Sequence, residues 1–270
     1  MKATAVLTLK RSIAIVLLFF LLIMFIHVSK YEISIRSSPT RCGVGNRAVT
    51  FQYLTQVAKS CERTANRTSV LIGVVSSADN FESRAAIRDT WGGTALKMGF
   101  IVVFLLGLTP DQKVQGKVLA EHETYGDVVQ GDFVDSYENL TYKTAMIIRW
   151  AREKCSETEF VLKIDDDMLL GVWDLAVVVN SLVGIKHSMW GYLYRNARPH
   201  RNVASKWYVS KEAYASDAYP DFLSGTAYLI SGDAISALDD VTHDECFFPL
   251  EDIYLTAIVA ERAQLSLVAM

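Results

Sequence analysis

Three consecutive aspartates, Asp165, Asp166 and Asp167, directly follow an apolar run at residues 160–164. Such a run is typical of a buried strand, which would place the carboxylates at a strand end. Mg²⁺ and Mn²⁺ prefer oxygen ligands, and a cation held by one or two carboxylates keeps open positions for substrate phosphates. Acidic runs also occur as solvated loops, and one of the three side chains could merely cap the following turn. The aspartates therefore suggest a cation site only in combination with their surroundings.

Strand and helix patterns alternate around the aspartates. Apolar runs predict buried strands at residues 70–75, 101–106, 128–129 and 160–164. Helical patterns lie between these runs, at residues 83–91, 111–125 and 139–155. This alternation predicts an α/β layer fold with a mostly parallel central sheet. In such sheets ligands bind beyond the carboxyl ends of the strands, where the aspartates would lie.

An almost unbroken apolar segment covers residues 12–28 and follows Lys2, Lys10 and Arg11. It nearly spans a hydrocarbon core of about 30 Å, and the positive charges before it keep the short N-terminus cytosolic. A cleaved signal peptide is the competing interpretation, but no clear cleavage site follows Val28. The predicted organisation is a cytosolic tail at 1–11, a transmembrane signal anchor at 12–28, a stem at 29–68 with a helix near 49–58, and a lumenal domain at 69–270.

Other features agree with a lumenal domain. Asn66 and Asn139 each begin an N-glycosylation sequon. The chain has four cysteines, Cys42, Cys61, Cys155 and Cys246. They could form disulfides in an oxidising compartment, with three possible pairings, and their spacing fits no zinc motif. The formal net charge of −3 is small, so no nucleic-acid partner is expected.

Six blocks of the sequence occur in the order of the motifs of one enzyme family. They are RAAIRDTW at 84–91, FLLG at 104–107, DFVDSYENLTYKT at 132–144, KIDDD at 163–167, YPDFLSGTAY at 219–228 and EDIY at 251–254. The chain therefore resembles the β1,3-glycosyltransferases, the family that includes β1,3-galactosyltransferases and β1,3-N-acetylglucosaminyltransferases. The resemblance implies a type II Golgi membrane enzyme with a GT-A fold that uses a UDP-sugar, Mn²⁺ and an inverting mechanism.

The resemblance also implies roles for the acidic residues. Asp167 matches the last aspartate of the family's DxD motif and is the predicted direct ligand of Mn²⁺, with Asp165 as a further metal ligand and Asp166 at the donor. Inversion needs a base that takes the proton from the acceptor hydroxyl, and we expect Asp252 in this role, with Glu251 as the second choice. The other member of that pair would be structural, because acidic residues that open a helix often only compensate its dipole.

Three basic residues are further candidates for donor binding. Arg84 and Arg88 are four residues apart, on one face of a helix, and arginine binds phosphate or carboxylate with two parallel hydrogen bonds. The alternative is that both form buried ion pairs with acidic residues such as Asp132 or Asp135. Lys143 is predicted at the donor site as well, paired with Asp135, which is itself a predicted donor-site residue.

Aromatic and small residues in the C-terminal half are predicted to bind sugar. Aromatic rings often stack on sugars, although core packing is as good an interpretation for each ring, and a glycine lets the backbone approach a sugar closely. The predicted sugar-binding positions are Trp190, Tyr192, Trp207, Ser224, Gly225 and Thr226. The Ser-Gly-Thr form at 224–226 resembles the galactosyltransferase branch, so UDP-galactose is the predicted donor and UDP-N-acetylglucosamine the alternative. The acceptor would be a terminal sugar of a glycoprotein or glycolipid.

The sequence departs from the family pattern in two places. Thr256 and Ile258 stand where the family usually has a glycine and a cysteine, so Cys246 would have an unusual partner or none. The chain also ends at Met270, earlier than family members generally do, which suggests a truncated gene model, a fragment or a shortened variant. A non-catalytic glycan-binding relative is therefore an alternative, against which the intact acidic motifs argue.

Overall fold

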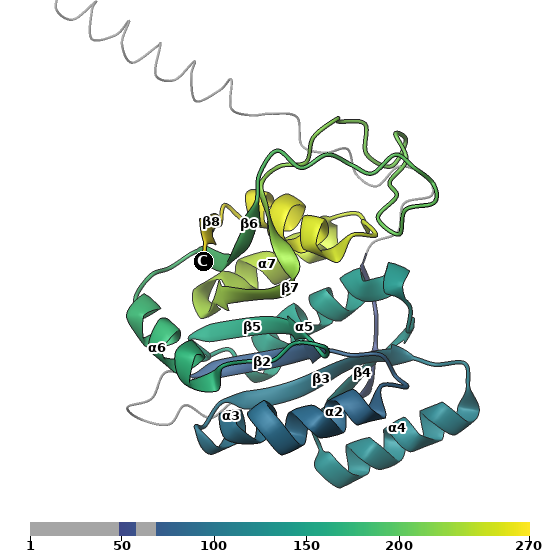
Figure 1. Ribbon diagram of the computed structural model, residues 1–270, viewed down its shortest axis with the longest axis vertical. Helices are drawn as coiled ribbons and strands as arrows, with labels where there is room; N and C mark the ends of the chain where they lie inside the picture. The colour runs from purple at the N-terminus through teal and green to yellow at the C-terminus, as the bar shows by residue number, and fades with distance from the viewer. Residues whose placement is uncertain (1–48, 58–68) are drawn as a thin grey trace, which may run out of the picture. The chain divides into compact units, whose positions relative to one another are not determined.

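The computed structural model describes residues 49–57 and 69–270, which contain one eight-stranded sheet in the order β1-β4-β3-β2-β5-β7-β6-β8 (Figure 1). The strands are β1 (Tyr53–Thr55), β2 (Val70–Val75), β3 (Ile101–Leu108), β4 (Val128–Val134), β5 (Phe160–Asp165), β6 (Ser188–Tyr194), β7 (Phe222–Ser231) and β8 (Ser266–Ala269). β1 and β7 are antiparallel to their neighbours, and the other strands share one direction. The predicted α/β fold is confirmed, with a mixed sheet in which four adjacent parallel strands form one half.

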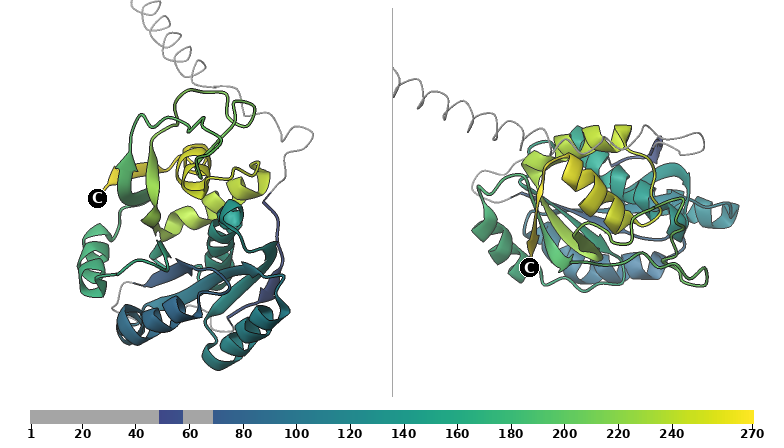
Figure 2. Two further views of the ribbon diagram at one scale, coloured as in Figure 1. Left: turned by 45° about the vertical axis from the view of Figure 1, so that its right-hand side comes forward. Right: turned by 90° about the horizontal axis from the view of Figure 1, so that it is seen from above.

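Helices cover both faces of the sheet (Figures 1 and 2). Their bounds are α2 (Phe81–Ile87), η1 (Arg88–Gly92), α3 (Gly93–Lys97), α4 (Gln112–Tyr125), η2 (Tyr137–Asn139), α5 (Leu140–Lys154), α6 (Val172–Leu182), η3 (Gly232–Ala234), α7 (Ile235–Asp244), η4 (Ile253–Val259) and α8 (Ala260–Arg262). One buried apolar cluster joins the sheet to α2, α3, α4 and α6, and a second joins its other face to α5, α7 and η4. The structure is therefore a three-layer sandwich with a core on each side of the sheet.

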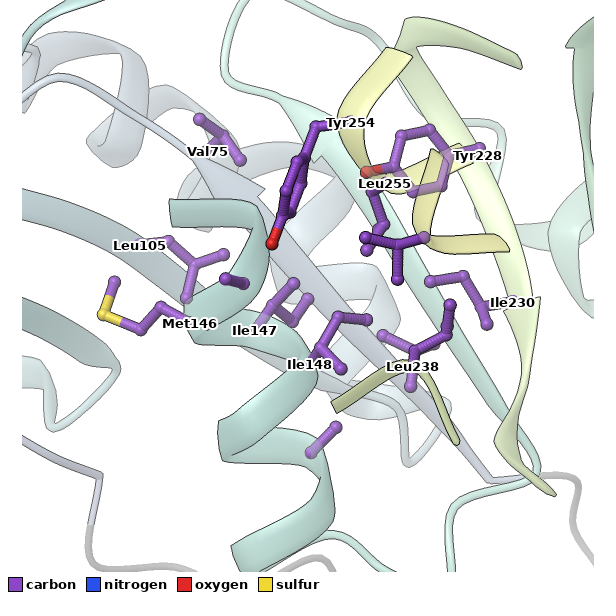
Figure 3. Close-up of a cluster of buried hydrophobic side chains, with 14 of the residues drawn as sticks. Val75, Leu105, Met146, Ile147, Ile148, Tyr228, Ile230, Leu238, Tyr254 and Leu255 are labelled. Carbon is purple, nitrogen blue, oxygen red and sulfur yellow. The ribbon is translucent and has the colours of Figure 1, made fainter. Parts of the chain in front are cut away.

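The second cluster places α5 directly against the centre of the sheet (Figure 3). Ile147 of α5 lies over Gly73 of β2, where an added Cβ would be only 1.7 Å from the Ile147 Cδ1 atom. Since glycine has no Cβ, α5 can approach β2 more closely than any other residue at position 73 would allow. This close packing fixes the position of the helix that begins next to the functional site.

Residues 49–57 differ from the sequence prediction, which expected a helix in a stem. Tyr53–Thr55 form β1, which pairs with β4 in antiparallel register, and Val49, Phe51 and Val57 are buried in the core. The alternation of buried and exposed side chains along this segment fits a strand at a sheet edge. The predicted helix near 49–58 is therefore wrong, and this segment packs with the domain rather than outside it.

The remaining predicted elements are present, β2 with the predicted bounds and the others with changed ones. β4 extends to Val134, and the predicted helix at 83–91 is divided into α2, the π-helical η1 and α3. The predicted anchor at 12–28 and the sequon at Asn66 lie outside the described residues. Within residues 49–57 and 69–270, no helix is long and apolar enough to cross a membrane. The second sequon asparagine, Asn139, precedes α5 and donates a hydrogen bond to the Val134 carbonyl at 2.8 Å.

The mixed sheet brings distant motifs to the carboxyl end of β5. Because β7 is antiparallel to β5 and Ala227 pairs with Ile164, residues 224–226 lie just beyond the end of β5, beside Asp165. The loop after β2 reaches the same edge, since Val75 pairs with Asp165 on the other side of β5. Segments about 60 and 90 residues from the aspartates in sequence therefore meet them in space.

Candidate active site

A pocket of about 650 Å³ opens at this edge of the sheet. Its walls come from the end of β5, the beginning of β7, the loop before η4, and the connection between β6 and β7. Eight of the predicted site residues line it, namely Asp165, Asp167, Trp207, Ser224, Gly225, Thr226, Glu251 and Asp252. The structure thus joins the two acidic motifs and the Ser-Gly-Thr segment in one cavity.

The three aspartates face different surroundings. Asp165 accepts a hydrogen bond from the Lys163 ammonium at 2.6 Å, and Asp166 accepts hydrogen bonds from Ser76 at 2.6 Å and Asn80 at 3.0 Å. The Asp167 carboxylate is exposed in the pocket and makes no hydrogen bond or ion pair with the described residues. Asp166 therefore ties the end of β5 to the loop after β2, whereas Asp167 keeps both oxygens available for a ligand.

A buried lysine, Lys163, connects the aspartates to the second acidic motif. Its ammonium group donates to Asp165 at 2.6 Å, to Glu251 at 2.9 Å and to the Gly225 carbonyl. Burial alone would lower the Lys163 pKa, but the carboxylates of Glu251 and Asp165 outweigh burial and raise it. Lys163 consequently stays charged and holds β5, β7 and the start of η4 together at the site.

Glu251 is buried and fully engaged within the protein. One oxygen accepts from Lys163 at 2.9 Å, and the other accepts from Thr144 at 2.8 Å and from Tyr228 at 3.1 Å. These bonds use most of its acceptor capacity and leave little for a substrate proton. The geometry suits a group that positions its neighbours.

Asp252 has a different environment from that of Glu251. It lines the pocket, and its carboxylate accepts a hydrogen bond from the Ile253 backbone amide at 2.9 Å. Burial raises the pKa of Asp252 to about 6, with a further contribution from the negative charge of Glu251. A carboxylate with a pKa near 6 is largely ionised at neutral pH yet is more basic than an ordinary aspartate, which suits a general base.

Arg84 is placed differently from the predicted donor contact. Its side chain is 0% exposed and binds Glu121 through Nε and Nη2, with Nε at 2.9 Å from Oε1 and Nη2 at 2.8 Å from Oε2. The remaining donors bind the loop after β2, including the Ser76 hydroxyl at 3.0 Å and the Ser77 carbonyl at 2.6 Å. All three guanidinium nitrogens are bound by protein groups, so Arg84 acts on the site by fixing the loop that carries Ser76.

Arg88 is likewise occupied by protein carboxylates. It forms two hydrogen bonds of 2.8 Å with Asp127 and an ion pair of 2.7 Å with Glu121. Arg84 and Arg88 thus both form ion pairs within the protein, which was the alternative to donor binding. Their partners are Glu121 and Asp127 rather than Asp132 or Asp135. The direct donor contact predicted for Arg88 is therefore absent from this arrangement.

The predicted pairing of Lys143 with Asp135 is confirmed. Their side chains are 2.6 Å apart, and the lysine also donates to the Ser76 carbonyl at 2.6 Å. Burial lowers the pKa of Lys143, which the Asp135 carboxylate opposes. Asp135 additionally accepts from the Gly107 amide at 2.8 Å. The pair holds the loop after β2 through the Ser76 carbonyl and does not line the pocket.

The three predicted aromatic residues separate into different roles. Trp190 is only 3% exposed and packs edge-to-face on Phe160 in the core, so its predicted sugar contact is wrong. Tyr192 is 64% exposed but is not among the residues lining the pocket. Trp207 is 45% exposed and lines the pocket, and is therefore the one of the three that is positioned to stack on a sugar.

Sequence reasoning assigned no role to Lys163 or Ser76, although both organise the site. Ser76 binds Asp166, Arg84 and, through its carbonyl, Lys143. A lysine at the second-last position of an otherwise apolar strand was a usable signal, because burial of an ammonium group requires carboxylate partners. Ser76 carried no comparable signal, since serine is common wherever a strand ends.

The residues present could hold a divalent cation together with a substrate. In the described part of the chain, no three His, Cys, Asp or Glu side chains are close enough to form a metal site alone. Asp167 has two free oxygens and Asp165 has one beyond its Lys163 contact, and both line the pocket. Mg²⁺ and Mn²⁺ commonly use one or two carboxylates and complete their coordination with phosphate and water. The donor set therefore fits such a cation.

The family departures have local consequences. Thr256 is buried and links η4 to β7, since its hydroxyl accepts from the Leu223 amide at 2.9 Å and donates to the Asp252 carbonyl at 2.6 Å. Cys155 and Cys246 are both disulfide-bonded, so the expectation that Cys246 could lack a partner is wrong. Thr256 thus stabilises the backbone that carries Asp252.

The acidic side chains thus line a pocket at the carboxyl ends of the strands, where α/β sheets bind their ligands. Residues 82–270 match the family described as galactosyltransferase. The chain therefore belongs to the galactosyltransferase family.

Several curated relatives are similar over most of the described region. Beta-1,3-galactosyltransferase 5 of Homo sapiens is 38% identical over 184 residues, covering 67% of this chain and 59% of the relative. Lactosylceramide 1,3-N-acetyl-beta-D-glucosaminyltransferase of Homo sapiens is 36% identical over 194 residues, covering 68% and 50%. Beta-1,3-galactosyltransferase 2 of Mus musculus is 33% identical over 217 residues, covering 78% and 51%. The matched region thus spans between 50 and 59% of the lengths of these relatives. Among solved structures, the mannosyltransferase Ktr4p from S. cerevisiae aligns over 80% of this chain and 74% of its own with 7% identity and a TM-score of 0.36.

Proposed function

We propose that this protein is an inverting β1,3-glycosyltransferase with a GT-A fold, which transfers galactose from UDP-galactose to a terminal sugar of a glycoprotein or glycolipid. The observation that carries the proposal is the meeting of Asp167 and Asp252 in one pocket, next to Ser224–Thr226. Family membership and relatives whose names specify β-1,3 transfer support the reaction class. The form of residues 224–226 favours galactose as the donor sugar.

The leaving group in this reaction is UDP, which gains negative charge as the bond between the anomeric carbon and the diphosphate oxygen breaks. Asp167 and Asp165 would hold Mn²⁺, which when bound supplies positive charge next to the diphosphate. Lys163 keeps Asp165 in place through its 2.6 Å bond, and Asp166 is kept on the loop after β2 by Ser76. The protein thus fixes the carboxylates before the donor arrives, which reduces the reorganisation needed in the transition state.

Asp252 is the proposed base. As the acceptor oxygen attacks the anomeric carbon on the face opposite the diphosphate, the acceptor hydroxyl proton passes to the Asp252 carboxylate, and UDP leaves. Glu251 is the proposed positioning partner, since three protein groups fix its carboxylate and its charge raises the pKa of Asp252. Trp207 would orient the acceptor sugar at the mouth of the pocket.

The predicted signal anchor at 12–28 gives the proposed location. A type II orientation would place residues 69–270 in the Golgi lumen, where UDP-sugars and glycan acceptors meet and where disulfides such as those of Cys155 and Cys246 persist. Protease protection in intact microsomes tests this orientation: the globular domain is protected if it is lumenal, and digestion of that domain without detergent contradicts the topology.

The decisive experiment is UDP release by the full chain from UDP-galactose with Mn²⁺ and a panel of β-linked N-acetylglucosamine, N-acetylgalactosamine and galactose acceptors. Acceptor-dependent release that is lost in Asp167→Ala and Asp252→Asn is the expected result. Asp132→Asn is the matched control, because this carboxylate binds the Gln52 amide at 2.8 Å outside the pocket. UDP release from UDP-N-acetylglucosamine alone would refute UDP-galactose as the donor. The absence of acceptor-dependent UDP release from both donors would refute the proposed function.

A further inference from the structure

The connection between β6 and β7 is an ordered wall of the pocket. Arg201 lies at its centre and donates to four backbone carbonyls, those of Val209 at 2.7 Å, Ser210 at 2.8 Å, Tyr214 at 2.8 Å and Ser216 at 2.7 Å. One guanidinium group thereby joins residues 209–210 to residues 214–216 of the connection. Fixed in this way, the connection can present side chains to the pocket in a defined geometry.

Two exposed basic residues of this wall, Arg198 and Lys206, line the pocket. Neither forms a hydrogen bond or salt bridge with the described residues. The Lys206 ammonium instead lies over aromatic rings, 4.7 Å from the centre of Trp207 and 5.8 Å from that of Tyr137. Contacts with ring faces restrict the position of the ammonium group but leave its N–H donors free for a ligand.

The carboxylates Asp165, Asp167 and Asp252 line the same pocket. Tyr137, whose ring the Lys206 ammonium contacts, lines it as well. A ligand in this pocket would therefore meet both acidic side chains and two cations that form no hydrogen bond or salt bridge with the described residues. A cation-bound diphosphate has the matching distribution of charge, because it is positive at the metal and negative at its outer oxygens.

We propose that Arg198 and Lys206 form an anion subsite that binds phosphate-type oxygens in the pocket that the aspartates also line. The inference rests on the proposed function in one respect, namely that the favoured source of these oxygens is the diphosphate of a nucleotide-sugar donor. An acidic substituent on the acceptor glycan has the same chemistry and is the second source. In either case the subsite acts through charge and hydrogen bonds, and Trp207 and Tyr137 position its lysine.

The test uses the full chain with inorganic pyrophosphate and UDP as probes, and calorimetric titration as a readout that needs no turnover. Lys206→Gln and Arg198→Gln should each weaken pyrophosphate binding by about tenfold, the size expected for one charge-assisted hydrogen bond. Lys206→Arg keeps the charge and should restore most of the affinity. Lys113→Gln is the matched control, because Lys113 is an exposed lysine of α4 that does not line the pocket.

Kinetics then identify the source of the anion. An increase of about tenfold in KM for the nucleotide sugar and in the inhibition constant of UDP, with KM for a neutral acceptor unchanged, assigns the subsite to the donor. Unchanged donor constants combined with loss of preference for sulfated over neutral acceptors assign it to the acceptor.

Unchanged pyrophosphate binding and unchanged constants for both substrates in both glutamine variants would overturn the proposal. Failure of the proposed function is a separate result. The wild-type chain would then lack acceptor-dependent UDP release, while the pyrophosphate titration would still show whether the subsite exists.

Discussion

Substitution of Gly225 by alanine tests how closely the acidic pair must be positioned. A Cβ at this position would lie 2.8 Å from Glu251 Oε1 and 3.3 Å from Asp252 Cβ. A carboxylate at the end of a flexible side chain could normally move aside. Glu251 cannot do so freely, because Lys163, Thr144 and other groups hold both of its oxygens. The new methyl group must therefore displace the acidic pair, or β7 must move away from it.

The size of the displacement follows from the contact distance. Ordinary van der Waals contact begins at about 3.4 Å, so relief of the 2.8 Å contact requires a shift of about 0.6 Å. A misplacement of about 1 Å at a reacting group can cost about 100-fold in rate, so a shift of this size predicts a loss of about tenfold in kcat. Overpacking of this kind also destabilises a core by about 1–3 kcal/mol.

The assay is acceptor-dependent UDP release by Gly225→Ala, with kcat and KM for donor and acceptor determined separately and thermal unfolding measured in parallel. The loss should appear mainly in kcat, because Asp252 is displaced while the carboxylates that bind the donor stay at the end of β5. Gly116→Ala is the matched control. No atom lies within 4 Å of its added Cβ, and alanine in the α4 helix should stabilise the protein by about 0.5–1 kcal/mol.

Wild-type kcat in a folded Gly225→Ala protein would refute this reasoning. It would mean either that the acidic pair tolerates a shift of this size or that Asp252 is not the base. An equal loss in Gly116→Ala would show that the assay reports general instability.

Four further predictions concern the pocket and the residues around it. The pKa of about 6 for Asp252 predicts that kcat/KM falls about tenfold between pH 7 and pH 5 as the base is protonated, and a flat profile over this range would contradict the assignment. Because this pKa lies above the ordinary 3.8, the folded state binds more protons than the unfolded state, and the stability that Asp252 contributes falls as pH rises from about 4 to 6. At pH 8, Asp252→Asn should therefore unfold at the same temperature as wild type or at a higher one. A large decrease in unfolding temperature would contradict this. Lys163→Met leaves Asp165 and Glu251 without their cation and should destabilise the protein by about 3 kcal/mol, measured by chemical denaturation, whereas a loss below about 1 kcal/mol would show that the lysine is dispensable. Trp207→Ala should raise KM for the acceptor with little change in unfolding temperature, while Trp190→Ala should lower that temperature through loss of core packing, and the opposite pattern would refute both placements.

Local patterns in the sequence determined much of the fold. The apolar run at 70–75 forms β2 with the predicted bounds, and the amphipathic pattern at 139–155 forms α5. Both patterns are strong because each element buries a face whose periodicity is visible in a single segment. The short edge strand β1 was missed because three residues carry too little periodic signal and because its conformation depends on pairing with β4.

The acidic residues of the site were also readable in advance, whereas the partners of the basic residues were not. Asp165, Asp167, Glu251 and Asp252 stand in motifs of distinctive residue types, and the structure brings them to one pocket. The side chain of Arg84 could reach either a ligand or a protein carboxylate, and only the tertiary structure places Glu121 within 2.8 Å of it.

The roles of the two tryptophans and of the two adjacent acidic residues also depended on the tertiary structure. Trp190 and Trp207 are the same residue type, but Trp190 lies in β6 and packs in the core, whereas Trp207 lies in the connection between β6 and β7 and lines the pocket. Glu251 and Asp252 are adjacent, yet Glu251 is held in a buried hydrogen-bond network, whereas the partly buried Asp252 carboxylate lines the pocket and has a raised pKa. Sequence thus determined which chemical groups the protein has, because residue types and local periodicity are encoded in single segments. Tertiary structure decided which groups are left free, because that depends on contacts between segments far apart in the chain.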